Sequence, residues 1–148
     1  MTITTNLILI PEAVKAYLNS NVGLFALNFV SERKHSPSTF LKDFTDLRVH
    51  ILTANKLIEI DSRGSTHSTI TVPVYINKRL NKDLDQEEID NLIQFTDDVN
   101  KFLLAETIPS TKFTCMGSMF VTVPSASRLE EQNVFTSLLN LTYHDGNR

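Results

Sequence analysis

The segment that most constrains the fold is residues 83–104, which has the repeat of one long amphipathic helix. Asp85 is suited to be its N-cap, and Glu88 follows three residues later, as in a capping box. Apolar residues recur every three or four positions and form one stripe: Ile89, Leu92, Ile93, Phe95, Val99, Phe102 and Leu103. A stripe this wide must be buried, so the rest of the chain has to supply a surface that covers it.

That surface is predicted to be a sheet, because apolar and polar residues alternate along much of the remaining chain. The clearest strand is residues 70–77, and further strands are predicted at 24–30, 47–53, 119–123 and 134–143. Pro73 has no backbone N–H to donate, so its strand should lie at an edge or carry a bulge. Neighbouring strands with no helix between them favour antiparallel pairing.

The other segments complete an α+β fold. A short N-terminal helix is predicted at residues 11–18, a polar loop at 31–39, and a hairpin tip or long loop at 54–68. We therefore expect a mainly antiparallel sheet of about five strands with the long amphipathic helix on one face. The length of 148 residues predicts a single domain, residues 1–148.

Composition and the length of the apolar runs indicate where the protein is located and which partners it lacks. The one cysteine, Cys115, cannot form an intrachain disulfide, so nothing indicates an oxidised, secreted protein. The apolar run at residues 7–10 is too short for a signal core, and residues 22–30 fall short of the ~20 residues that span a membrane. We expect a soluble protein of intracellular type with no membrane contact. A net charge of −3 also argues against a nucleic-acid binder that acts by bulk charge.

The sequence offers no convincing catalytic or metal site. Its histidines are predicted to be exposed or incidental, because no two have the i, i+3 or i, i+4 spacing that directs two imidazoles at one ion: His35, His50, His67 and His144. Cys115 is predicted to be a small apolar residue rather than a nucleophile. Adjacent acids such as those at 87–88 and 97–98 point in different directions from a helix and indicate a solvated face. We expect no enzyme activity, no cofactor and no metal.

Charge is distributed unevenly along the chain. Residues 83–106 carry eight acidic residues against Lys101 alone, a net −7, and the remainder carries +4. Such a chain can dock head-to-tail on copies of itself, a contact that closes into a ring if the rotation permits. The simpler alternative is an acidic helix face that aids solubility. The candidate interface residues are Lys56, Arg63, Lys78, Arg79, Glu87, Glu88, Asp97 and Asp98.

Two stretches carry a resemblance to a known family. One is residues 70–80 (ITVPVYINKRL) with the acidic helix that follows and ends VNKFL, and the other is residues 129–143 (LEEQNVFTSLLNLTY). Together they resemble the tail terminator or tail-completion proteins, which long-tailed bacteriophages place in the neck between head and tail. The strand at residues 48–52 and the loop at 62–63 are similar in position. The resemblance covers about residues 45–145 and does not extend to the first 44 residues.

The resemblance implies a virion structural protein assembled in the host cytoplasm. Its subunit would form a ring, usually a hexamer, that caps the tail tube and joins it to the head connector without catalysing a reaction. Expected partners are further copies of the chain, tail tube or sheath proteins and head connector proteins, with passive contact to DNA in the lumen. The resemblance implies that three surfaces of this chain make contacts in the ring: the charged helix, the 54–68 loop facing a neighbouring ring, and an edge strand. Two alternatives remain open: a head-closure or adaptor protein of the same neck, or a small nucleic-acid-binding or thiol-dependent protein.

Overall fold

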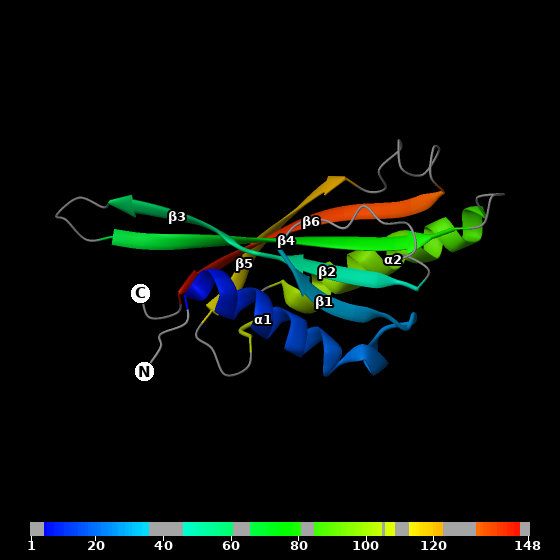
Figure 1. The fold of residues 1–148 in the computed structure, drawn as a ribbon, viewed down its shortest axis with the longest axis horizontal. Coiled ribbons are helices and arrows are strands. Elements are labelled where there is room, and N and C mark those ends of the chain that lie inside the picture. The colour runs from blue at the N-terminus through cyan, green and yellow to red at the C-terminus, as the bar shows by residue number, and fades with distance from the viewer. Residues whose placement is uncertain are drawn as a thin grey trace.

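The structure is a computed structural model that describes residues 5–35, 46–60, 66–80, 85–104, 106–108, 113–122 and 133–145. Over these ranges, two α-helices lie on one face of a mixed, mostly antiparallel sheet of six strands (Figure 1). The elements are α1 (Asn6–Asn19), a 3₁₀ turn η1 (Val22–Leu24), β1 (Val30–Lys34), β2 (Arg48–Leu52), β3 (Asn55–Ile60), β4 (Thr66–Arg79), α2 (Gln86–Leu103), β5 (Phe113–Thr122) and β6 (Val134–Asp145).

The sheet is built around the long β4–β6 pair. Its strand order is β1-β2-β4-β6-β5, and β3 pairs with β4 beside β2. The β1–β2 pair is parallel and the other pairs are antiparallel. The predicted α+β fold with a mainly antiparallel sheet is therefore confirmed, with one strand more than expected.

The long helix is confirmed in position and in its buried face. Asp85 caps α2 by accepting a hydrogen bond from the Glu87 backbone N–H at 3.1 Å. The side chain of Glu88, expected to complete a capping box, instead binds Lys78. The buried side chains of α2 are Ile89, Leu92, Phe95, Thr96, Val99 and Leu103.

One core joins the helices to the sheet. The β4 and β6 side chains that face the helices are the apolar sets predicted from alternation, such as Val72 and Val74 opposite Leu141 and Leu139. The two helices also meet each other, because the rings of Tyr17 in α1 and Phe102 in α2 stack at 4.7 Å. No helix in the described part of the chain is long and apolar enough to cross a membrane.

Pro73 lies in an interior strand, so the edge alternative is wrong. β2 pairs with residues 74–77 of β4, and β3 pairs with residues 66–71 on the same side. Between these blocks, the last residue of β2 and the two residues that connect it to β3 (52–54) face only two residues of β4 (72–73), which is the mismatch of a bulge. The proline occupies the point where the ladder is interrupted, which is where a missing N–H does least harm.

The predicted strand at 24–30 and polar loop at 31–39 are both wrong in their described parts. Phe25 and Phe29 do not lie in a ladder but pack against α2, with the Phe25 ring 5.8 Å from that of Phe95 and 5.4 Å from that of Phe102. The strand begins only at Val30 and runs through the polar residues to Lys34, pairing with β2. Residues 36–39 of the predicted loop lie outside the described residues.

The N-terminal helix is longer than predicted. It begins at Asn6, capped by the Thr5 hydroxyl, and includes Pro11 as an interior residue. Pro11 has no N–H to donate to the carbonyl of Leu7 four residues earlier. That carbonyl instead accepts a hydrogen bond from the Ala54 backbone N–H at 3.3 Å, which ties α1 to the β2–β3 connection.

Residues 54–68 are only partly the loop that was predicted. Residues 55–60 form β3, which pairs with residues 66–71 of β4 to make an antiparallel ribbon that we call the arm. Residues 61–65, which include the predicted tip, lie outside the described residues. In Figure 1 the arm extends past the helical layer at the left, away from the first turns of α2 at the right.

Candidate functional site

The structure joins two of the candidate interface residues within one chain. Lys78, near the end of β4, donates to Glu88 in the first turn of α2 with Nζ and Oε1 at 2.8 Å. Both side chains are about 30% exposed, so the pair sits at the rim between the sheet and the helix. The two charges compensate each other there and hold the start of α2 against β4.

Other candidates line the solvent-facing side of α2. Asp97 binds Lys101 one turn later at 2.8 Å, and the Asp98 carboxylate accepts from the Gln94 side chain at 2.9 Å. The hydrogen bond and charge of Asp97 raise the pKa of Lys101 above its usual range. Such i, i+4 contacts stabilise the helix surface and leave the face acidic overall.

The remaining candidates lie in two separate regions of the molecule, with Arg79 and Glu87 beside the Lys78–Glu88 pair and Lys56 on the arm. Lys56 is exposed on the arm, Arg79 is exposed at the opposite end of β4, and Glu87 is exposed at the start of α2. Arg63 lies outside the described residues. The candidates therefore do not form one compact site but a basic position on the arm and an acidic face on α2.

The acidic face of α2 borders a groove between α2 and β5. It has a volume of about 430 Å³ and is lined by Asp90, Ile93, Gln94, Asp97 and Phe120. Only Asp97 was among the sequence candidates. Ile93 was assigned to the buried stripe, and no sequence signal indicated that Phe120 of β5 would lie across from it. We call these five residues the acidic groove.

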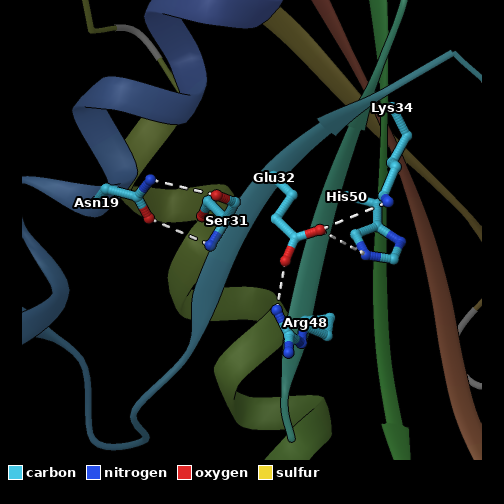
Figure 2. A network of polar contacts seen from close by, with 6 residues as sticks. All are labelled: Asn19, Ser31, Glu32, Lys34, Arg48 and His50. Carbon is cyan, nitrogen blue, oxygen red and sulfur yellow. Dashed lines mark hydrogen bonds and ion pairs between the residues drawn. The ribbon is translucent and has the colours of Figure 1, made fainter. Parts of the chain in front are cut away.

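A network of charges surrounds Glu32 on the other face of the sheet (Figure 2). The Glu32 carboxylate forms an ion pair with Arg48, lies 3.6 Å from Lys34 Nζ, and lies 3.9 Å from His50 Nε2. His50 is 1% exposed, so of the two alternatives predicted for the histidines, exposed or incidental, the exposed one is wrong for this residue. The network explains how β1, a strand of mostly polar residues, is held beside β2.

The same region does not have the arrangement of a hydrolase triad. Ser31 and Glu32 are adjacent on β1 and point to opposite sides of the strand (Figure 2). The Ser31 backbone N–H and C=O bind the Asn19 side chain amide at 3.1 and 3.2 Å, which attaches β1 to α1. The Ser31 side chain thus lies on the helix side, whereas His50 and Glu32 lie on the other.

Cys115 is buried in the core, as a small apolar residue would be. Its Sγ lies 3.4 Å from the Gly117 carbonyl oxygen, and in the sheet register it faces Tyr143. Burial raises the pKa of the Tyr143 phenol well above its usual range, and the neighbouring Cys115 adds to the shift. Over the described ranges, no three His, Cys, Asp or Glu side chains gather in a way that could hold a metal ion.

Comparison with known proteins gives a likeness in structure and none in sequence. No protein-family model matches the sequence, and no curated protein is significantly similar to it. Among solved structures, a chain from the virion of a native gene transfer agent particle matches with a TM-score of 0.57 and 13% identity, over 92% of each chain. At that identity the likeness establishes a shared fold, which here includes nearly the full length of both chains.

Proposed function

We propose that the protein is a structural component of a phage-like virion, and specifically the tail terminator that forms a ring in the neck. The observation that carries the proposal is the fold shared with a virion chain over 92% of both lengths. The resemblance of residues 70–80 and 129–143 to tail terminator proteins supports the finer assignment. In this role the protein is not an enzyme and acts through its surfaces alone.

The distribution of charge and shape suits a ring subunit. The arm extends at one end of the molecule and carries the exposed Lys56 near its junction with the sheet, and the acidic α2 lies toward the other end (Figure 1). Surfaces that differ in this way pair head-to-tail, and repeated head-to-tail contacts close into a ring when the rotation between subunits is an integral fraction of a turn. We expect a hexamer that caps the tail tube, meets the head connector on its other side, and lets DNA pass through its lumen.

Tube-capping is the direct test. The tail-tube protein from the same genome would be polymerised with and without the purified chain, and tube lengths would be measured by electron microscopy. A terminator should stop elongation and leave a ring at one tube end. Tubes of unchanged length without bound protein would contradict the terminator assignment.

The same preparation tests the runner-up, a head-closure or adaptor protein. The chain would be incubated separately with tail tubes and with portal-containing heads, and co-sedimentation would be measured. Binding to heads with no effect on tubes would move the assignment to the head side of the neck. Binding to neither, together with absence from purified virions by mass spectrometry, would contradict a virion role altogether.

A further inference from the structure

The arm exposes apolar side chains that nothing in the described chain covers. Leu57 is 56% exposed and Ile58 is 58% exposed, although both lie in a regular strand. Lys56 pairs with Ile70 and Ile58 pairs with Ser68, so Lys56 and Ile58 point to one side of the ribbon and Leu57 points to the other. One side of the arm therefore presents a basic and an apolar side chain two residues apart.

The acidic groove has the complementary chemistry. Its lining combines two apolar side chains, Ile93 and the 39% exposed Phe120, with the carboxylates of Asp90 and Asp97. Asp97 is already bound to Lys101, whereas Asp90 has no ion pair within the described ranges. An occupant that suits this groove has an apolar side chain close to a cation, on a segment narrow enough to enter.

We propose that the arm of one copy docks in the acidic groove of the next copy, with Ile58 against Phe120 and Ile93, and Lys56 beside Asp90. The inference rests on the proposed ring and names the contact that builds it. Within one chain the described lining of the groove comes from α2 and β5 and includes no residue of the arm, which extends away from α2 (Figure 1). The contact is therefore heterologous, as ring closure requires.

The proposal predicts which substitutions weaken self-association. Ile58→Asp removes the apolar insertion and should weaken it by roughly 10- to 100-fold. Lys56→Asp and Asp90→Lys should each weaken it by roughly fivefold, because the pair lies at a solvated rim. Combining Lys56→Asp with Asp90→Lys in one chain should restore the wild-type value to within about threefold, since both opposite charges are exchanged. Sedimentation velocity over a concentration series measures these values.

Complementation between variants tests the head-to-tail geometry. Arm variant Ile58→Asp and groove variant Phe120→Asp should each be monomeric, and an equimolar mixture should give heterodimers and nothing larger, because each dimer retains one intact contact. Phe120→Ser, which also removes the apolar ring from the groove, serves as a second groove variant if Phe120→Asp does not fold by circular dichroism. The matched control is Leu24→Asp, at a residue that is 72% exposed and belongs to neither surface.

The outcomes separate this contact from the proposed function. Unchanged association of Ile58→Asp, failure of the charge exchange to restore it, or mixtures that form full rings would each overturn the docking of arm in groove. A wild-type chain that is monomeric at every concentration would also overturn it. Tube-capping would be measured in each case. If the wild-type chain caps tubes but the Ile58→Asp variant associates normally, the terminator role stands and only the docking of the arm in the groove is contradicted.

Discussion

Single residues decide how the N-terminal helix meets the sheet. Pro11 leaves the Leu7 carbonyl without its helical donor, and the Ala54 N–H takes that place. Ala54 belongs to the bulged connection that faces Pro73 in β4. Two prolines distant in sequence thus act at one junction, and neither role could be inferred from local propensity because each depends on a partner brought in by the fold.

The buried hydroxyl of Tyr143 is predicted to lower the stability of the fold. The side chain is fully buried, and no described group accepts or donates a hydrogen bond to its oxygen. A buried polar group without a partner costs free energy, so Tyr143→Phe should raise the free energy of unfolding at neutral pH by about 1 kcal/mol. Chemical denaturation of both proteins measures this, and a loss of stability would mean that the hydroxyl has a partner.

The same residue predicts a pH dependence. Burial raises the folded-state pKa of Tyr143, so above the ordinary tyrosine pKa of about 10 the unfolded chain loses a proton that the folded chain keeps. The unfolded state then binds fewer protons, and stability falls as pH rises. The decline between neutral and strongly alkaline pH should be smaller in Tyr143→Phe than in the wild type. Equal slopes would show that Tyr143 ionises freely in the fold.

The Glu32 network predicts a measurable contribution from one carboxylate. Glu32→Gln keeps the shape but removes the charge that faces Arg48, Lys34 and His50. We expect a loss of about 1 kcal/mol in unfolding free energy, since the glutamate is only partly buried. Glu87→Gln is the control, because Glu87 is exposed in the first turn of α2 and should change stability by less than about 0.5 kcal/mol.

At the scale of elements, periodicity identified those that are buried on one face. α2, β4 and β6 were predicted because their apolar residues repeat with helical or strand spacing over many positions. β1 was missed because its residues are mostly polar and are held by ion pairs and by Asn19. β3 was missed because Leu57 and Ile58, two adjacent apolar residues, are both exposed on the arm, so they do not alternate with polar residues as a half-buried strand would.

The packing of α2 against the sheet predicts that its buried stripe contributes strongly to stability. Leu92 is 1% exposed in the middle of the buried stripe, and Leu92→Ala should cost about 2–5 kcal/mol through lost contacts and the cavity left behind. Asn91→Ala, at the exposed neighbouring position, should leave stability nearly unchanged. Thermal and urea denaturation of the three proteins compare them, and a cost below about 1 kcal/mol would mean that the helix packs loosely.

At the scale of the whole molecule, the unequal distribution of charge corresponds to two separate surfaces, the arm with Lys56 and the acidic face of α2. The sequence predicted opposite charges on loops and helix, but it did not reveal that Lys78 and Glu88 neutralise each other within the chain. Nor did it identify the acidic groove, which requires β5 to lie beside α2. Fewer charged residues are consequently available to bind partners than the net charges of the two parts of the sequence suggested.

Charge reversal on α2 tests whether that face contacts other subunits. Replacing both Asp97 and Asp98 by Lys should abolish ring formation and tube-capping while leaving the thermal midpoint nearly unchanged, because solvent screens the exposed Asp97–Lys101 pair. Glu12→Lys is the control, since Glu12 is also a helical surface acid paired with a lysine. A variant that unfolds at much lower temperature would show that the two acids serve folding.

The end of the arm is the least supported part of the sheet. Residues 66–68 of β4 pair with β3 alone, because the β4–β6 ladder begins at Thr69. A two-stranded ribbon is marginally stable in water, so these backbone amides should exchange hydrogen for deuterium sooner than those of the β4–β6 pair. Exchange there should slow sharply once subunits associate, which makes these amides a built-in reporter of ring closure.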